Sequence, residues 1–332
     1  MARSLTVRRE EYPLQGVFRI SRGARTISEV ISVEIEEAGA DGRARGRGEC
    51  FPYSRYGETL DSVEAQIETL RGPIELGLDR NDLQGQLPSG AARNALDCAL
   101  WDLEAKESGH PAWSLAGLPA PEPITTVYTL GVDDPEVMGS KAAENSGRPM
   151  LKLKMTGDGL DLERVSAIHA RAPSARLVVD ANEGWTAEEY TRLAPKLGAL
   201  GVEMIEQPLP AGDDEGLRGL ERPIPVCADE ACHDSATLDS LLGKYDVVNI
   251  KLDKTGGLTE ALKLRAAAEA MGFRIMVGCM VGSSLAMAPG MLVAQGTWIV
   301  DLDGPLLLAR DCIPGLVYTG SIIQPAQPAL WG

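Results

Sequence analysis

The sequence predicts an α/β protein in which a (β/α)8-type barrel follows a smaller α+β unit. Two observations lead to this fold class. After a proline-rich stretch, eight short apolar segments alternate with helical patterns, which is the spacing of βα repeats. Before that stretch, a β-rich run and a hairpin signal precede two helical patterns. The chain has 332 residues, 44% of them apolar, so it can bury a core for one large domain or for two smaller ones.

The α+β unit begins with strands. Residues 30–35 are rich in β-branched side chains, and Asp41-Gly42 is a hairpin turn signal that precedes a strand-like return to Cys50. A helix is predicted over residues 60–70. A longer one carries an apolar stripe over residues 92–103 and ends before Gly109 and Pro111.

The prolines at 119, 121 and 123 predict a linker, after which the barrel strands begin. The predicted strands are residues 124–130, 151–155, 177–180, 202–206, 226–229, 247–252, 274–279 and 298–302. Helices between them are signalled by a capping box at Thr186 and Glu189 and by an Ala/Leu-rich run over residues 259–270 that stops at Gly272. An open doubly wound sheet is the alternative. It requires a glycine-rich phosphate turn after its first strand, and the glycines of residues 42–48 belong to a hairpin instead.

Composition excludes several classes of partner. The net charge of −16 argues against binding to nucleic acid or to an anionic membrane, because both are polyanions. We find no apolar run long enough to span a bilayer, and residues 1–12 lack the apolar core of a signal peptide. The six cysteines have no zinc-binding spacing and are typical of reduced thiols. These features predict a cytoplasmic protein.

Charged residues stand at the ends of successive predicted strands. Asp180, Glu206 and Asp229 end three neighbouring strands, so a barrel would bring them together at its C-terminal mouth. Three converging carboxylates repel one another unless a cation holds them. Oxygen-only ligands suit a hard ion, magnesium first and manganese second. Three separate ion pairs are the alternative interpretation.

Lysines complete the pattern. Lys152 and Lys154 are two residues apart on one strand, so both point into the mouth. Lys251 lies four strands further on, which is the opposite side of an eight-stranded barrel. A substrate between them could lose a proton from one face and regain it on the other. A metal at the carboxylates would stabilise the enolate formed when a carboxylate substrate loses its α-proton.

With these residues the chain resembles the enolase superfamily, in its muconate-lactonizing-enzyme branch, through the Lys-x-Lys strand, the Asp/Glu/Asp triad and the opposed lysine. Over most of its length it resembles dipeptide epimerases of the L-Ala-D/L-Glu type. The stretches that carry the resemblance are residues 18–25, 52–58, 90–103, 179–185, 206–210, 227–233, 249–262 and 301–305.

The resemblance implies a modified TIM barrel, (β/α)7β, and one magnesium ion. It implies an α+β capping domain built from the N-terminal part and the C-terminal tail. The corresponding boundaries are 1–120 for the capping domain, 121–308 for the barrel and 309–332 for the segment that returns to the capping domain.

The resemblance also implies roles for individual residues. Lys154 and Lys251 are expected to be the acid/base catalysts, with Lys152 as the electrophilic group at the substrate carboxylate. Asp180, Glu206 and Asp229 are expected to hold the metal. The remaining expected substrate contacts are Asp301 and Asp303 for the α-ammonium, Arg25 for a side-chain carboxylate, and Thr129 and Cys279. Strand 274–279 ends in Cys279 where the mandelate racemase branch has a histidine, which disfavours that branch.

The expected reaction is epimerization of a small dipeptide at the α-carbon of its C-terminal residue, in the recycling of murein peptides. Three alternatives remain open: an epimerase of another dipeptide class, a lyase or cycloisomerase such as o-succinylbenzoate synthase, and a metal-bound module without catalysis. The Asp301/Asp303 pair favours an ammonium-bearing substrate over the lyase, and the two opposed lysines argue against the module. The residues allow a homo-oligomer without fixing one.

Overall fold

The computed structural model describes residues 3–39 and 42–332. In these residues the strands form three sheets, with orders β1-β2-β3, β12-β11-β10-β9-β8-β7-β6-β5 and β13-β14-β4. The strands are β1 (Arg3–Ile20), β2 (Gly23–Gly39), β3 (Gly42–Cys50), β4 (Ile124–Thr125), β5 (Tyr128–Leu130), β6 (Met150–Lys154), β7 (Arg176–Asp180), β8 (Val202–Glu206), β9 (Val226–Ala228), β10 (Val247–Ile250), β11 (Arg274–Val277), β12 (Ile299–Val300), β13 (Tyr318–Thr319) and β14 (Ile322–Ile323).

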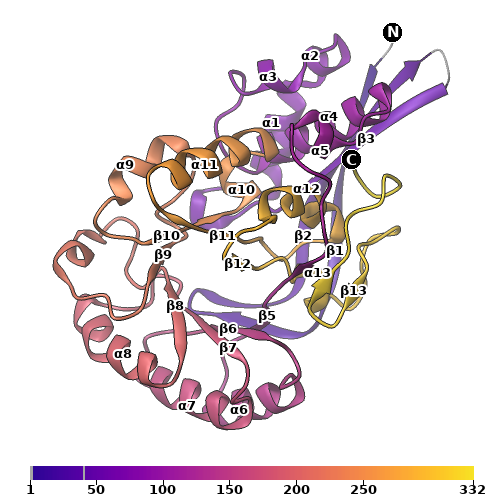
Figure 1. The fold of residues 1–332 in the computed structure, drawn as a ribbon. Coiled ribbons are helices and arrows are strands. Elements are labelled where there is room, and N and C mark those ends of the chain that lie inside the picture. Colours follow the sequence, from indigo (N-terminus) through magenta and orange to yellow (C-terminus); the bar gives the residue numbers. More distant parts are fainter. Residues whose placement is uncertain (1–2, 40–41) are drawn as a thin grey trace.

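Helices surround the large sheet and cover the N-terminal one (Figure 1). They are α1 (Leu60–Thr69), α2 (Arg71–Glu75), α3 (Arg80–Leu83), α4 (Ala91–Ser108), α5 (Ala112–Leu115), α6 (Pro135–Glu144), α7 (Asp161–Arg171), α8 (Ala187–Ala199), α9 (Leu238–Leu241), α10 (Leu252–Thr255), α11 (Leu258–Ala270), α12 (Ser284–Ala294) and α13 (Gly304–Leu307). The predicted capping box of α8 is confirmed, because Thr186 and Glu189 bond each other's backbone amides. None of the described helices is long and apolar enough to cross a membrane.

The N-terminal unit is an antiparallel sheet with α4 packed on it. Its helices confirm the two predicted from sequence. Sheet and helix approach closely, because a Cβ at Gly46 or Gly48 would lie 2.1 Å from a carbonyl oxygen of α4. Of the predicted hairpin turn, Asp41 lies outside the described residues. Gly39 and Gly42 pair across that point, in agreement with a β2–β3 hairpin.

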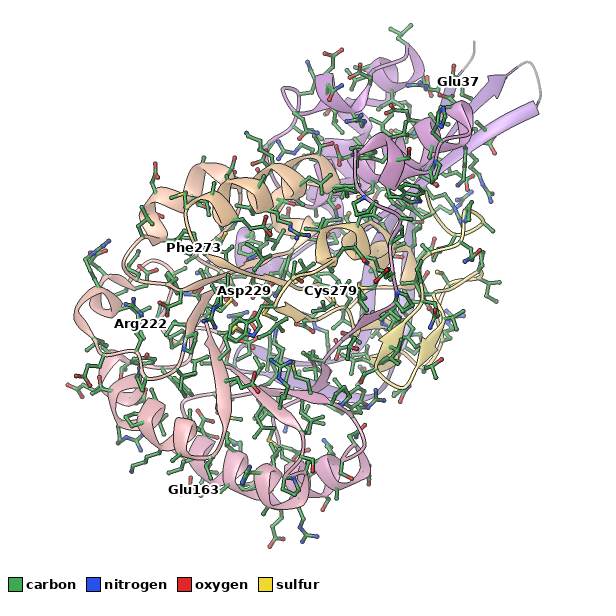
Figure 2. The ribbon with its side chains drawn as sticks, viewed as in Figure 1. Glu37, Glu163, Arg222, Asp229, Phe273 and Cys279 are labelled. Atoms are coloured by element: carbon green, nitrogen blue, oxygen red, sulfur yellow. The ribbon has the colours of Figure 1, made fainter. Side chains whose placement is uncertain are left out.

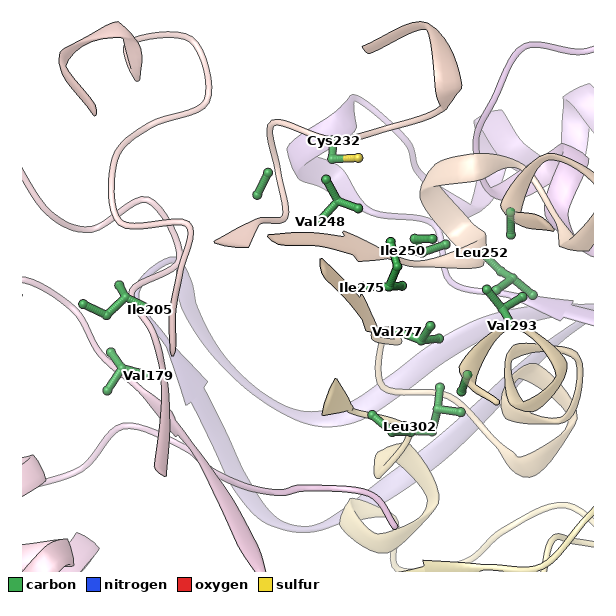
Figure 3. Packing of buried hydrophobic residues seen from close by; sticks show 14 of the residues in the cluster. Val179, Ile205, Cys232, Val248, Ile250, Leu252, Ile275, Val277, Val293 and Leu302 are labelled. Atoms are coloured by element: carbon green, nitrogen blue, oxygen red, sulfur yellow. The ribbon is translucent and has the colours of Figure 1, made fainter. Parts of the chain in front are cut away.

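The large sheet is a barrel of eight parallel strands, as predicted. Its two outermost strands meet where the Val127 amide donates to the Val300 carbonyl oxygen at 2.9 Å. Inside the barrel, each strand, or in one case the residue just before it, contributes one side chain to a buried apolar cluster. These side chains are Val127, Met150, Val178, Met204, Cys227, Val247, Met276 and Ile299. Side chains on the outer face, such as Ile250 and Val277, pack against the surrounding helices (Figure 3). The fold is thus a modified TIM barrel with an α+β cap.

Two predicted strands need correction. Residues 124–130 are not one barrel strand, because β4 pairs with β14 in the small third sheet and only β5 enters the barrel. Between them the Thr126 amide donates to Ser321 and the Val127 amide to Val300, so the chain changes sheets within one dipeptide. Residues 247–252 also do not form a single strand. β10 ends at Ile250 and α10 begins at Leu252, and a glycine pair with positive φ at 256–257 then separates α10 from α11.

The C-terminal residues lie on the N-terminal unit. Arg47 donates to the Ala329 carbonyl oxygen at 2.7 Å, the Trp331 indole donates to the Cys98 carbonyl oxygen at 2.9 Å, and the Gly332 amide donates to Asp102 at 2.6 Å. In Figure 1 the yellow C-terminal segment runs beside the violet elements. The domain boundaries at 120 and 308 remain predictions.

Candidate active site

The site lies at the C-terminal mouth of the barrel, where the strand ends bring charged side chains together. Asp180 ends β7, Glu206 ends β8 and Asp229 follows β9. Their side chains are buried, and one oxygen of each lies within 4.8 Å of the others. The structure therefore places the predicted triad in one cluster, as expected from neighbouring parallel strands.

The strand ends that carry the triad have unusual backbone conformations. Asn182, Glu183 and Gln207 have positive φ values of 44°, 66° and 34°. Such conformations cost free energy and persist only where neighbouring contacts enforce them. The Gln207 side chain provides such contacts, because its Oε1 accepts from the amides of Asp229 and Ala231 at 2.9 and 3.0 Å. Gln207 thereby ties the end of β8 to the end of β9.

Lysines stand around the triad. Lys154 Nζ donates to Asp180 at 2.6 Å, and Lys251 Nζ donates to Asp229 at 2.6 Å. Lys152 Nζ lies 2.6 Å from Glu206, 2.6 Å from Asp301 and 3.2 Å from Asp180. β6 and β10 are four strands apart in the closed sheet, so Lys154 and Lys251 face each other across the mouth.

The charges of this cluster are unevenly balanced. Burial raises the pKa of Glu206 to about 7, helped by the negative charge of Asp180. Burial opposes the ionisation of Asp229 too, but Lys251 and Lys254 overcome it and hold its pKa well below the usual range. Burial disfavours the ammonium form of Lys251, but Asp229 outweighs it and raises the pKa of that lysine. Glu206 is therefore the member of the triad whose negative charge the protein compensates least.

The residues present fit a divalent hard cation. The donor set consists of carboxylate oxygens, which magnesium prefers. Glu206 Oε2 is buried and accepts no hydrogen bond from the described residues, although Lys152 Nζ lies close by without hydrogen-bond geometry. The buried Oδ1 atoms of Asn182 and Asn249 also lack donors in the described chain. A bound cation would satisfy the acceptor on Glu206 and reduce the repulsion among the three carboxylates.

A cavity of about 320 Å³ opens above the triad. The predicted residues that line it are Arg25, Thr129, Lys152, Lys154, Asp229, Lys251, Cys279, Asp301 and Asp303. Asp180 and Glu206 do not line it, but they are buried beside Asp229, which does. In Figure 2, Asp229 and Cys279 lie near the middle of the barrel, just beyond the ends of β9 and β11. All predicted site residues thus belong to one cavity or its floor.

Asp301 and Asp303 form a second acidic group with Cys279, again within 4.8 Å. Asp301 accepts from Lys152, whereas Asp303 accepts from the Thr129 amide at 2.6 Å. Burial raises the pKa of Asp303 to about 7, and the charge of Asp301 adds to the shift. A cationic group of a ligand would relieve this repulsion.

Three arginines of the N-terminal sheet and the following loop line the same cavity. Arg22 donates to Glu230 at 2.6 Å, and Arg55 donates to Glu183 at 2.7 Å. Arg25 lies with its guanidinium carbon 4.9 Å from the Phe51 ring centroid, and none of the described carboxylates pairs with it. Arg25 is therefore the cavity arginine available for an anionic ligand.

Sequence reasoning missed several residues of the site. Asn249 donates to Glu206 at 2.7 Å, and Lys254 donates to Asp229 at 2.7 Å. Asn249 lies on β10, two residues before Lys251, so strand periodicity could have placed it in the mouth. The side chains of Gln207 and Lys254 come from residues beyond the ends of β8 and β10, where strand periodicity no longer applies.

Comparison with known proteins agrees with this geometry. Residues 2–117 match the family described as the mandelate racemase / muconate lactonizing enzyme N-terminal domain, and residues 138–305 match the enolase C-terminal domain-like family. The chain belongs to the mandelate racemase/muconate lactonizing enzyme family of the enolase superfamily.

Individual members of this family are closely similar. L-Ala-D/L-Glu epimerase of Escherichia coli is 46% identical over 319 residues, covering 96% of this chain and 98% of that protein. N-acetyl-D-glutamate racemase of Pseudoalteromonas is 44% identical over 297 residues, covering 88% and 93%. A solved enolase family member from Agrobacterium tumefaciens, with bound sodium and L-Ala-L-Glu, superposes with a TM-score of 0.96 at 50% identity and covers 99% and 100% of the two chains.

Proposed function

We propose that this protein is an isomerase that epimerizes a dipeptide at the α-carbon of its C-terminal residue, most favourably L-Ala-D/L-Glu, with magnesium as cofactor. The observation that carries the proposal is the pair of buried lysines, Lys154 and Lys251, on opposite sides of one cavity whose floor is a carboxylate triad. A single base can exchange a proton on one face, but inversion by 1,1-proton transfer requires a group on each face.

In the proposed mechanism one lysine removes the α-proton as a free amine and the other donates a proton from the opposite face as an ammonium. The reverse direction exchanges these roles. Lys152 lies between the triad and Asp301, where its buried ammonium would bind the substrate carboxylate. Magnesium held by Asp180, Glu206 and Asp229 would supply positive charge that stabilises the carboxylate as the α-proton leaves.

The other charges of the cavity suit the rest of a dipeptide. Asp301 and Asp303 would bind the α-ammonium, with Thr129 and Cys279 beside them. Arg25 would bind a side-chain carboxylate, since the other two cavity arginines are already paired with Glu183 or Glu230. The three charges of Ala-Glu then each have a complementary partner.

N-acetylglutamate racemization is a second candidate, because one of the similar relatives is a racemase of N-acetyl-D-glutamate. That substrate has the same amide bond to glutamate as Ala-Glu, but its acetyl group carries no ammonium, so it would leave Asp301 and Asp303 without a cation. The acidic pair therefore favours the dipeptide over the acylated amino acid. It disfavours an o-succinylbenzoate synthase-type lyase for the same reason.

The cellular setting is also part of the proposal. The described cysteines are all free thiols, which supports a reducing compartment such as the cytoplasm. A dipeptide of alanine and glutamate is a fragment of murein, so the recycling of murein peptides would supply this substrate.

The deciding experiment is a substrate screen in deuterated water. Each turnover replaces the α-proton by deuterium, which mass spectrometry detects for every candidate. We expect L-Ala-L-Glu and L-Ala-D-Glu to exchange and interconvert in the presence of magnesium. N-acetyl-D-glutamate should react far more slowly, and dipeptides with an apolar second residue should lie between. Rapid turnover of N-acetyl-D-glutamate with inert Ala-Glu would establish the racemase instead.

Single-lysine variants test the two-base assignment. Lys154→Ala and Lys251→Ala should each abolish interconversion, and each should retain exchange of only the epimer whose α-proton faces the remaining lysine. Near wild-type interconversion by both variants would show that the lysines are not the bases.

A further inference from the structure

The residues that follow Lys251 are hydrogen-bonded to residues of the capping unit, outside the barrel. Lys251 is the N-cap residue of α10, and the four residues of that helix are buried. Asp253 Oδ1 accepts two hydrogen bonds from the capping unit, one from the Phe51 amide at 3.0 Å and one from Asn94 Nδ2 at 2.8 Å. The Asp253 carboxylate, two residues beyond the proposed base Lys251, is thus held by α4 and by Phe51, which lines the cavity.

The contact extends along the whole segment. Arg93, also on α4, donates to the carbonyl oxygens of Thr255 and Gly256 at 2.6 and 3.1 Å. Gly256 and Gly257 have φ values of 78° and 111°. A Cβ on either glycine would lie 2.4 Å from an atom of the Arg93 or Asp97 side chain. Glycine is required here both by the backbone conformation and by the close approach of α4.

Lys154 is held differently. The residues that follow it are bonded within the barrel, because Asp161 accepts from the Thr156 and Gly157 amides at 3.2 and 2.9 Å. The Trp185 indole donates to the same carboxylate at 2.7 Å. Among the described residues, the hydrogen bonds of this turn come from barrel elements. The two proposed bases are thus supported by different parts of the molecule.

We infer that Asp253, bonded to Asn94 and to the Phe51 amide, is a positioning residue that sets Lys251 against the substrate, and so governs one of the two proton transfers more than the other. The inference rests on the proposed function. Asp253 joins Lys251 to Phe51, whose ring packs under Arg25. The capping unit would thereby fix the position of Lys251 relative to Phe51 and Arg25, on the side of the cavity that would bind the substrate.

Displacement of Lys251 would change the ratio of deuterium exchange to inversion in a characteristic way. For the epimer whose proton Lys154 removes, abstraction stays fast but donation by Lys251 becomes slow. Deuterium then returns to the starting epimer before inversion occurs. For the other epimer abstraction itself is slow, and inversion follows each abstraction. The ratio of exchange to inversion therefore rises for one epimer only, whereas a general loss of active enzyme lowers all rates together.

The experiment measures this ratio for L-Ala-L-Glu and L-Ala-D-Glu by proton NMR in deuterated water, with magnesium-loaded enzyme. Asp253→Ala should raise the ratio for the epimer served by Lys154 by about tenfold or more, since small misplacements of a catalytic group cost rate steeply. Asp253→Asn keeps Oδ1 for both donors and should behave like the wild type. Asn94→Ala removes one of the two donors and should shift the ratio in the same direction by less.

Trp101→Phe is the matched control, because Trp101 also joins α4 to the barrel, through a 2.9 Å bond to Thr259, which is eight positions beyond Lys251 in the chain. It should leave the ratio unchanged. Proportional loss of all rates in Asp253→Ala, or an equal shift in Trp101→Phe, would overturn the inference. Failure of the wild-type protein to exchange or invert either epimer would instead overturn the proposed function.

Discussion

Arg25 illustrates how a single residue acquires a role through the pairing of its neighbours. Arg22 and Arg55 line the same cavity, but acidic residues at the strand ends already neutralise them. Arg25 keeps its guanidinium against the Phe51 ring, which leaves its hydrogen-bond donors free to form a fork toward a carboxylate. From sequence, Arg25 was a positional match among several arginines. The contacts of the other arginines could not be known before the strand ends were placed.

The Arg25→Ala substitution should therefore affect acidic substrates selectively. Loss of the guanidinium leaves a partly desolvated side-chain carboxylate unpaired, at a cost of about 2–5 kcal/mol. We expect kcat/KM for Ala-Glu to fall by roughly 30-fold or more, and kcat/KM for dipeptides with an apolar second residue to change much less. Steady-state kinetics on both substrate classes measure this. Arg55→Ala provides the control, and equal losses for both classes in Arg25→Ala would mean that Arg25 is structural.

At the scale of elements, β3 and α12 are joined by one buried carboxylate. Glu49 accepts from the amide of Ser283 at 2.7 Å and from its hydroxyl, and Ser283 is the N-cap of α12. Burial raises the pKa of Glu49 to about 8, with further contributions from Glu10 and Asp253. The capping sheet thus contacts the barrel through a group that is protonated more readily in the folded state than in the unfolded one.

This contact makes stability depend on pH in a definite direction. Because the folded-state pKa is raised, the stabilisation by protonated Glu49 is fully present below the unfolded value of 4.5 and is lost as pH rises through about 8. Glu49→Gln is neutral at every pH. Between pH 5 and 8 its free energy of unfolding should fall less steeply than that of the wild type, by up to about 1.4 kcal/mol per pH unit. Urea unfolding at several pH values measures the slopes, and parallel slopes would contradict the assignment.

Elements were predictable from sequence where one periodic pattern dominates. The apolar strands followed by Asp180, Glu206 and Asp229 needed only the rule that parallel strands end at the same edge. The prediction of a single barrel strand over residues 124–130 was wrong because β4 pairs with β14. That strand lies almost two hundred positions away in the chain, and no local pattern encodes the pairing. The same holds for Gln207 and Lys254, whose contacts depend on backbone turns formed only in the folded barrel.

At the scale of the whole molecule, metal binding and folding should be linked. A cation that binds the triad only in the folded state stabilises the protein by about 2.7 kcal/mol at a hundred times its dissociation constant. We expect saturating magnesium to raise the thermal midpoint of the wild type by several degrees and excess chelator to reverse the rise. The rise should be much smaller in Asp229→Asn.

Differential scanning calorimetry with and without magnesium tests this linkage without any assay of activity. Glu163→Gln, on the outer side of α7 and far from Asp229 (Figure 2), should keep the full response. A response in Asp229→Asn equal to that of the wild type would place the metal elsewhere. Chelation should also abolish turnover, and magnesium should restore it.

The bonds between the C-terminal residues and α4 have a consequence for synthesis. Trp331 and its partner Cys98 are 233 positions apart, so at roughly 5–20 residues per second the ribosome needs about 10 to 50 s to deliver the second after the first. The N-terminal part of the cap is synthesised first, but it gains its contacts with the C-terminal residues only when the last of them leave the ribosome. A nascent chain interrupted before that point would carry every proposed catalytic residue and still lack the contacts that close the cap over them.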